Sequence, residues 1–242
     1  DPGLADVGLV IFDEFHERSL DSDLCLALAQ HGRHLYRDGP ALKLLVMSAT
    51  LNGEAVSTLL GNAPIITSSG RQYPVETRYG EPYQVRQSIV EPTVKTVLLA
   101  LREQTGSLLV FLPGQREISA VSRHLSDALN VLDDESVQIA PLYGGLSLER
   151  QKLALLPAPE GMRKVVLSTN VAETSLTIEG ITVVVDSGLV REAIFDPPTG
   201  LTRLATRRIS RASSEQRQGR AGRQAPGFCY RLWTEQQQGR LV

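Results

Sequence analysis

Short apolar runs alternate with amphipathic stretches through the first part of the chain. The run Leu9–Phe12 is too short for a helix and ends abruptly in charged residues, which is typical of a buried parallel strand that reaches the edge of a sheet. Residues 20–35 have leucines at helical spacing and two aspartates in the first turn, which predicts an amphipathic helix. The elements predicted to follow are a buried strand over residues 42–47, a short helix capped by Asn52, and short strands over residues 65–67 and 75–79.

The same alternation continues after residues 80–83, whose sequence Gly-Glu-Pro-Tyr has the character of a linker. Helices are predicted over residues 92–102, 115–129 and 147–156 and near Val171, and strands over residues 108–112, 137–140, 165–168 and 181–186. Strands that alternate with helices predict a parallel sheet covered by helices on both faces. The sequence therefore predicts an α/β protein of two such units in tandem, with domains at residues 1–80 and 81–242.

The alternation breaks between Leu189 and Thr206. Two extended runs, residues 189–195 and 201–206, flank the segment Asp-Pro-Pro-Thr-Gly at residues 196–200. This pattern predicts a β-hairpin with a loop stiffened by proline. From the pattern alone, a surface decoration and a functional arm fit the hairpin equally well.

The composition is that of an ordinary soluble globular protein, with 42% hydrophobic and 21% charged residues. No apolar stretch approaches the length that spans a bilayer, and the first residues lack a signal-peptide pattern, so we expect a cytoplasmic protein without membrane contacts. Cys25 and Cys229 are far apart and are expected to be reduced thiols. The four histidines complete no zinc-ligand spacing.

The net charge of −2 gives no indication of a nucleic-acid partner, but the distribution of arginines does. Eight of them gather in one late segment that has few acidic residues: Arg191, Arg203, Arg207, Arg208, Arg211, Arg217, Arg220 and Arg223. A clustered basic surface is the usual electrostatic feature of proteins that bind phosphates. The segment is therefore predicted to present such a surface.

Two adjacent carboxylates, Asp13 and Glu14, follow the first predicted strand. In a nucleoside-triphosphate site, the first carboxylate would hold the hydration shell of Mg²⁺ and the second would orient and deprotonate the attacking water. Acidic pairs after strands also serve as helix N-caps. The pair alone does not decide between these two interpretations.

The segment Ser210–Arg223 is the second stretch whose residue types indicate a functional site. Ser213 or Ser214 is predicted to cap a helix that places Gln216 and Arg220 on one face, with Arg223 one turn further on. Gly219 and Gly222 are poor helix residues, so close approach of a backbone or a phosphate is expected at these positions. Small hydroxyl residues at 168–175 follow a strand and are suited to contact phosphates.

Together these segments resemble the motifs of DEAH-box helicases of superfamily 2, and most closely those of the bacterial HrpB type. The matching segments occur in the order of the family's motifs II to VI: residues 13–18, 48–50, 109–118, 168–178 and 216–223. The resemblance implies tandem RecA-like domains, the first carrying motifs II and III and the second carrying motifs IV, V and VI. It also identifies the hairpin with the family's strand-separating element.

The resemblance implies a role for each matching residue. In the first domain, Asp13 would bind Mg²⁺ through water and Glu14 would act as general base. His16 would contribute to nucleotide binding and couple the nucleotide site to the second domain. Ser48 and Thr50 would couple hydrolysis to domain movement. In the second domain, Gln216 would position the water, and Arg220 and Arg223 would contact the γ-phosphate as arginine fingers. Thr169 would touch the nucleic-acid backbone, and Thr174 and Ser175 would lie near the nucleotide.

The resemblance implies an ATP-dependent RNA helicase that uses ATP and Mg²⁺ and has RNA as its partner. The chain contains no G-x-x-x-x-G-K-[ST] segment, which the family carries upstream of motif II. We therefore expect an internal fragment that is inactive by itself and belongs to an active longer protein. A non-catalytic nucleic-acid-binding scaffold and an ATP-driven DNA translocase remain as alternative interpretations.

Overall fold

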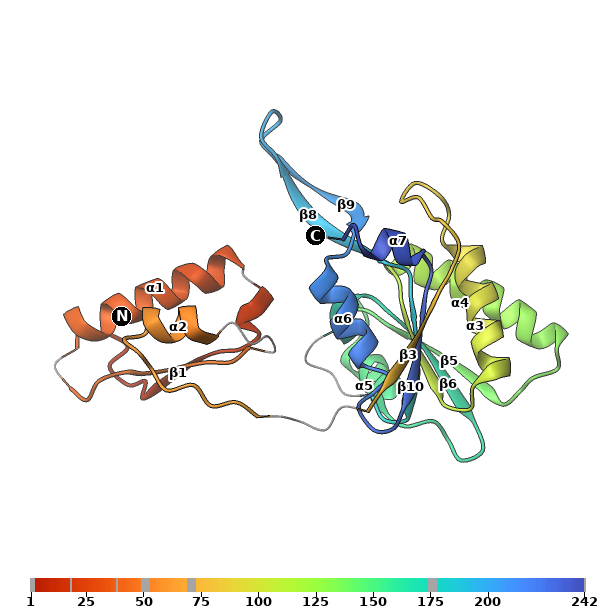
Figure 1. Cartoon of the computed structure of the whole chain (residues 1–242), viewed down its shortest axis with the longest axis horizontal. Coiled ribbons are helices and arrows are strands. Elements are labelled where there is room, and N and C mark those ends of the chain that lie inside the picture. The colour runs from red at the N-terminus through yellow and green to blue at the C-terminus, as the bar shows by residue number, and fades with distance from the viewer. Residues whose placement is uncertain are drawn as a thin grey trace. The chain divides into compact units, whose positions relative to one another are not determined.

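The computed structural model of the chain describes residues 3–17, 19–37, 39–48, 53–68, 73–173 and 178–241. The chain divides into two compact units, Asp1–Ser69 and Gly70–Val242 (Figure 1). Both units are built from parallel strands and helices, as predicted. Among the described helices, none is long and apolar enough to cross a membrane.

The first unit is a small layer of two parallel strands and their helices. β1 (Leu9–Phe12) pairs with β2 (Lys43–Val46), and α1 (Leu20–Leu35) and α2 (Gly53–Leu59) contribute to the core on one face of the strands. The centre of this core is Phe12, Phe15 and Leu26. The predicted strands over residues 9–12 and 42–47 and the helix over residues 20–35 are present, whereas residues 65–67 form no strand and Asn52 lies outside the described residues. The expectation that both strands are buried is wrong, because Leu9, Ile11 and Leu45 are exposed. The leucines that predicted the helix, Leu20, Leu24, Leu28 and Leu35, are also exposed, and Leu26 is the leucine of α1 that packs in the core.

The second unit contains a six-stranded sheet in the order β3-β10-β7-β4-β6-β5, in which every pairing is parallel. The strands are β3 (Val75–Tyr79), β4 (Ser107–Phe111), β5 (Val137–Leu142), β6 (Arg163–Ser168), β7 (Ile181–Asp186) and β10 (Gly227–Arg231). The parallel α/β architecture predicted from the alternation is therefore confirmed.

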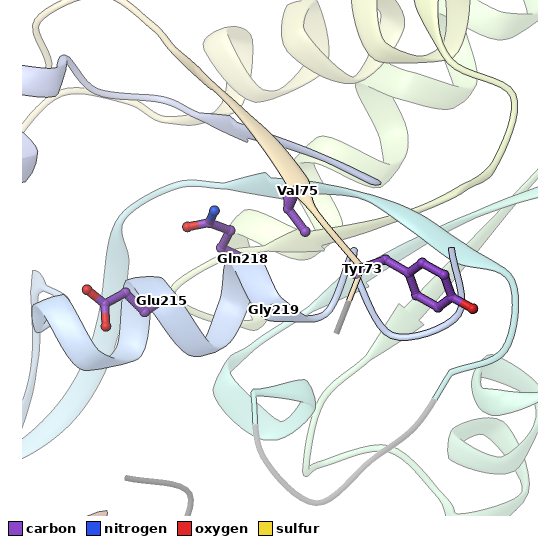
Figure 2. Close-up of a pocket in the computed structure, with 6 residues that line it drawn as sticks. Tyr73, Val75, Glu215, Gln218 and Gly219 are labelled. Atoms are coloured by element: carbon purple, nitrogen blue, oxygen red, sulfur yellow. The ribbon is translucent and has the colours of Figure 1, made fainter. Parts of the chain in front are cut away.

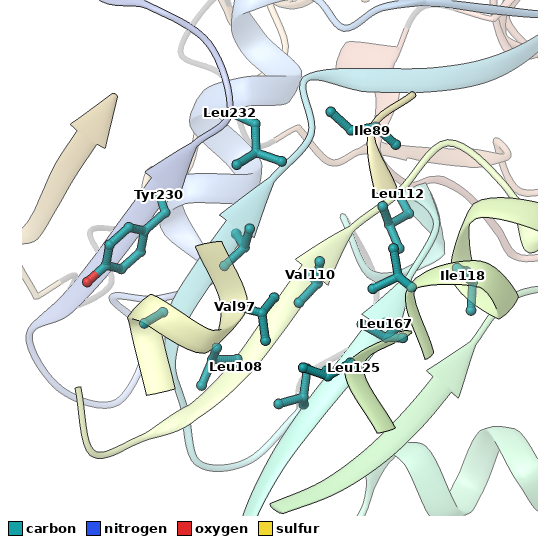
Figure 3. Packing of buried hydrophobic residues seen from close by; sticks show 14 of the residues in the cluster. Ile89, Val97, Leu108, Val110, Leu112, Ile118, Leu125, Leu167, Tyr230 and Leu232 are labelled. Carbon is teal, nitrogen blue, oxygen red and sulfur yellow. The ribbon is translucent and has the colours of Figure 1, made fainter. Parts of the chain in front are cut away.

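Helices cover both faces of this sheet. On one face, α3 (Val90–Glu103) and α4 (Gln115–Val131) pack on Leu108 and Val110 of β4 in the core shown in Figure 3. On the other face, Leu109 and Phe111 of the same strand pack with residues of α5 (Leu148–Leu155). Because successive side chains of a strand point to opposite faces, β4 is buried on both sides, which explains its uninterrupted apolar sequence.

The position of β3 corrects the predicted domain boundary. Residues 75–79 pair with residues 227–231 of β10, so they belong to the sheet of the second unit. The boundary between residues 80 and 81 was therefore wrong by one strand. The linker-like Gly80 instead follows β3, where its amide donates to the carbonyl of Arg231 at 2.8 Å.

The predicted hairpin is confirmed as β8 (Leu189–Asp196) and β9 (Leu201–Arg208), an antiparallel pair that projects from the second unit (Figure 1). Gly200 has a φ of +67° at the turn, a conformation that glycine adopts without steric cost. The base of the hairpin is anchored in a separate apolar cluster of Val190, Ile209, Trp233 and Leu241. After β9 the chain continues into α6 (Arg211–Gly219), β10 and α7 (Glu235–Gln238).

Candidate functional site

The acidic pair of the first unit lies in the turn between β1 and the short 3-10 helix Phe15–Glu17. Asp13 is exposed, and its Oδ1 accepts the amide proton of Glu14 at 2.8 Å. Glu14 Oε2 lies 3.6 Å from Nδ1 of His16, whose side chain is largely buried. The structure thus places these three predicted residues together in one turn.

The acidic pair is not the N-cap of α1. α1 is capped by Ser19, whose side chain accepts from the amide of Ser22. Glu14 has a φ of +49°, a left-handed conformation that costs a residue other than glycine about 1–3 kcal/mol and that is concentrated at functional sites. The amide of the neighbouring Phe15 donates a hydrogen bond to the carbonyl of Met47 at 3.0 Å. Backbone strain in a turn held in this way is consistent with a carboxylate positioned for chemistry.

The coupling residues predicted after β2 are only partly visible. Ser48 is exposed at the end of that strand. It lies next to the turn of Asp13, because the preceding residue, Met47, donates its amide to the carbonyl of Phe12 at 2.8 Å. Thr50 lies outside the described residues. Within the described part of the chain, no group of three or more His, Cys, Asp and Glu side chains is arranged to hold a metal ion.

The predicted basic helix exists, but it begins earlier than expected. Ser210 caps α6 by accepting from the amide of Ser213, so the prediction that Ser213 or Ser214 is the cap is wrong. Ser214 is instead buried and donates its hydroxyl to the carbonyl of Arg211. Ser210 is favoured because its extended backbone leaves its hydroxyl facing the free amides of the first turn.

The three predicted catalytic residues of this helix lie at and just beyond its C-terminal half. Gln216 and Arg220 are four residues apart, and Arg223 is exposed in the turn that follows. Arg220 is 6% exposed, and its Nε donates to the backbone carbonyl of Glu173 at 2.8 Å. This contact joins motif VI of the resemblance to motif V.

Arg217 is a functional candidate that the sequence analysis did not single out. It is 1% exposed; its Nε donates to Glu173 Oε2 at 2.8 Å, and its Nη1 donates to Asp186 Oδ1 at 2.9 Å. Burial by itself lowers the pKa of Arg217, but the charges of Asp186 and Glu173 outweigh burial, and the net effect is a raised pKa. Arg217 is therefore a buried cation held between two carboxylates.

Thr169 directly follows β6 at the edge of the sheet where the carboxyl ends of the strands meet. It is half-buried, its amide donates to the carbonyl of Leu142 at 3.3 Å, and it precedes the 3-10 helix Asn170–Ala172. Ligands of open α/β sheets bind at this edge. Thr174 and Ser175, which belong to the same motif, lie outside the described residues.

A pocket of about 270 Å³ opens beside α6 (Figure 2). Its lining residues are Tyr73, Val75, Glu215, Gln218, Gly219 and Gly222. A Cβ at Gly222 would lie 2.5 Å from the carbonyl oxygen of Tyr73, so the predicted close backbone approach is confirmed for this glycine. A Cβ at Gly219 would meet no described atom within 4 Å, so packing within the described chain does not explain this second glycine.

The predicted basic surface is smaller than the count of arginines indicates. Arg191 forms an ion pair with Glu117 at 3.1 Å, Arg208 donates to the carbonyl of Tyr83, and Arg217 is buried. Arg203 and Arg207 are exposed on β9. The exposed basic residues therefore include positions on the hairpin as well as around α6.

Comparisons with known proteins agree with this fold. Residues 91–225 match the helicase conserved C-terminal domain. The chain is 51% identical over all 242 residues to the ATP-dependent RNA helicase HrpB of Escherichia coli, of which it spans 29%. It is 44% identical over 238 residues to the pre-mRNA-splicing factor ATP-dependent RNA helicase prp22 of Schizosaccharomyces pombe, of which it spans 20%.

Solved structures give the same result. Two crystal structures of E. coli HrpB, one described as a DExH-box NTPase and one as a DEAH/RHA helicase, match the whole chain with TM-scores of 0.88 and 0.90. The chain covers 29% and 30% of those structures, respectively. The chain belongs to the family of proteins with a helicase conserved C-terminal domain, and within it to the DEAH-box helicases that include HrpB.

Proposed function

We propose that the full-length protein is an ATP-dependent RNA helicase and that this chain contributes residues of its catalytic and RNA-binding machinery. The observation that carries the proposal is the 51% identity that extends over all 242 residues to a protein named as an ATP-dependent RNA helicase. The turn of Asp13 and Glu14 and the arginines of α6 give this proposal its chemistry.

In the first unit, we assign Asp13 to the metal and Glu14 to the attacking water. Mg²⁺ usually retains several waters and takes one or two carboxylates together with substrate phosphates, which fits a single exposed carboxylate at the end of a strand. When bound, Mg²⁺ neutralises charge on the phosphates. Glu14 accepts the proton of the water, and His16, 3.6 Å from Glu14 Oε2, orients that carboxylate. Ser48 and Thr50 transmit hydrolysis to domain movement.

In the second unit, we assign Gln216 to the attacking water and Arg220 and Arg223 to the γ-phosphate of ATP. An arginine finger contributes roughly 10³–10⁵ in rate, or about 4–7 kcal/mol. A site that depends on such residues hydrolyses ATP slowly until they are engaged, so RNA binding can control hydrolysis. Thr169 contacts the RNA backbone, and Thr174 and Ser175 contribute to nucleotide binding.

The experiment is the ATPase activity of the full-length protein alone, with single-stranded RNA and with single-stranded DNA of the same sequence. The proposal predicts that RNA raises kcat and that DNA raises it less. Stimulation by DNA alone would identify a DNA translocase instead. Binding of RNA without any ATP hydrolysis would identify a non-catalytic scaffold.

A further inference from the structure

A single buried guanidinium connects three segments of the second unit that are far apart in the sequence. Arg217 belongs to α6, Glu173 follows the 3-10 helix after β6, and Leu189 is the first residue of the hairpin strand β8. Nε of Arg217 donates to the Glu173 carboxylate, while Nη1 donates to Asp186 Oδ1 at 2.9 Å and to the carbonyl of Leu189 at 3.2 Å. The guanidinium of α6 thus has acceptors after β6, at the end of β7 and at the start of β8.

The orientation of this guanidinium is fixed from several sides. The Arg217 guanidinium carbon lies 4.8 Å from the centre of the Phe111 ring, and Asp186 is completely buried at the end of β7. Asp186 Oδ1 also accepts the amide of Gly188 at 2.8 Å, in the turn that leads into the hairpin. A planar guanidinium that binds acceptors in fixed directions cannot be replaced by a compact ammonium without losing part of the set.

Glu173 extends this arrangement to the proposed catalytic residue Arg220. The carboxylate of Glu173 is held by Arg217 at 2.8 Å, while the backbone carbonyl of the same residue accepts Nε of Arg220 at 2.8 Å. Nη2 of Arg220 donates to that carbonyl as well. The position of Arg220 therefore depends on Glu173, and the position of Glu173 depends on Arg217.

We propose that Arg217 is a positioning residue that sets Arg220, which we assign to the γ-phosphate, through Glu173 and ties it to the base of the β8–β9 hairpin. This inference rests on the proposed function. A displacement of Arg220 when the nucleotide is bound or hydrolysed would be passed through Glu173 and Arg217 to the carbonyl of Leu189. Hydrolysis and movement of the hairpin are then linked through side chains that touch neither ATP nor RNA.

Two variants of the full-length protein test the proposal, with Glu179→Ala as the control. Glu173→Ala removes the relay carboxylate but leaves Arg217 paired with Asp186. Arg217→Lys keeps a cation beside Asp186 but cannot donate to all three acceptors. Glu179 is exposed near the same loop and makes no part of the proposed machinery.

Each variant is measured for RNA-stimulated ATPase activity, thermal unfolding and the change in amide hydrogen exchange that ATP produces in residues 189–208. We expect both variants to lower kcat about tenfold, within the range found for residues that modulate coupling, while KM for ATP changes less than about twofold. We also expect the ATP-dependent change in exchange at the hairpin to be lost, and Glu179→Ala to behave as the wild type.

The outcomes separate the inference from the proposed function. If the wild type hydrolyses ATP and both variants retain its kcat per folded molecule and its exchange response, Arg217 is only structural and the proposal is overturned. Full activity of Arg217→Lys alone would also overturn it, because charge opposite Asp186 would then suffice. Absence of ATPase activity in the wild type would instead overturn the proposed function, and the inference with it.

Discussion

Gly188 provides a quantitative test of the packing at the base of the hairpin. It lies between β7 and β8 with a φ of +70°, and a Cβ built at this position would lie 2.8 Å from Cε3 and 2.9 Å from Cζ3 of Trp233. The Trp233 side chain is 1% exposed, so it has little room to move away. We therefore expect Gly188→Ala to destabilise the second unit through both its backbone and its new side chain.

The two contributions can be separated with a second glycine. An alanine in the left-handed conformation costs about 1–2 kcal/mol, and overpacking a filled core costs about 1–3 kcal/mol, so Gly188→Ala should cost about 2–5 kcal/mol. Gly200 has a similar φ of +67°, but a Cβ there would meet no described atom within 4 Å. Gly200→Ala should therefore cost only the backbone contribution, about 1–2 kcal/mol.

Urea unfolding followed by tryptophan fluorescence measures the difference, because Trp233 is the single tryptophan of the 242-residue chain and reports on the second unit. The free energy of unfolding should be lower for Gly188→Ala than for Gly200→Ala by about 1–3 kcal/mol. Equal destabilisation by the two substitutions would refute the reasoning, since the contact with Trp233 would then contribute nothing.

Two further predictions concern buried titratable groups of the second unit. Burial raises the pKa of Cys229 from 9.0 to about 12. The contribution of this protonated thiol to the free energy of unfolding is therefore fully present below pH 9. It is lost as the pH rises towards 12, by up to roughly 4 kcal/mol. Urea unfolding between pH 8 and pH 11 should therefore show a steeper loss for the wild type than for Cys229→Ala, and identical slopes would contradict the assignment. Lys164, which is 3% exposed, donates from Nζ to the carbonyls of Leu153 and Leu156 at the end of α5, so Lys164→Met should cost about 1–3 kcal/mol. The exposed Lys152→Met serves as its control, and an equal loss of unfolding free energy in the two variants would show that the buried contacts are not stabilising.

The alternation of strands and helices was predictable because it follows from local periodicity. β4 has only apolar residues after Ser107, since its side chains are buried on both faces of the sheet. The amphipathic spacing of α4 is equally direct, because Ile118, Val121, Leu125 and Leu129 form its buried face. The hairpin was equally local, because turn residues at 196–200 separate two extended runs.

The domain boundary could not be placed from local signals, because it depends on pairing between distant strands. The local sequence of β3 would be the same at the end of the first unit and at the start of the second. Only its pairing with residues 227–231 assigns it to the second unit. β10 itself was not predicted. Its sequence Gly-Phe-Cys-Tyr-Arg has the aromatic content of a strand, and that signal could have identified it.

The candidate site was predictable where residue type determines chemistry and not where burial determines it. Asp13 and Glu14 were identified because carboxylates that directly follow a short apolar strand have few roles, and the structure places both in one turn. Arg217 was grouped with a basic surface, since a sequence shows charge but not which arginine of a helix is buried. The carboxylate of Asp186, directly after the three valines 183–185, was the available signal that a buried cation had to be nearby.

The assignment of Glu14 as general base is tested most directly by Glu14→Gln in the full-length protein. Binding of ATP and its hydrolysis in a single turnover are measured for the wild type, for this variant and for Glu54→Gln, an exposed glutamate of the same unit. We predict that Glu14→Gln retains the Kd for ATP and hydrolyses it about 10²–10⁴ times more slowly, while Glu54→Gln matches the wild type. Hydrolysis by Glu14→Gln at the wild-type rate would contradict the account.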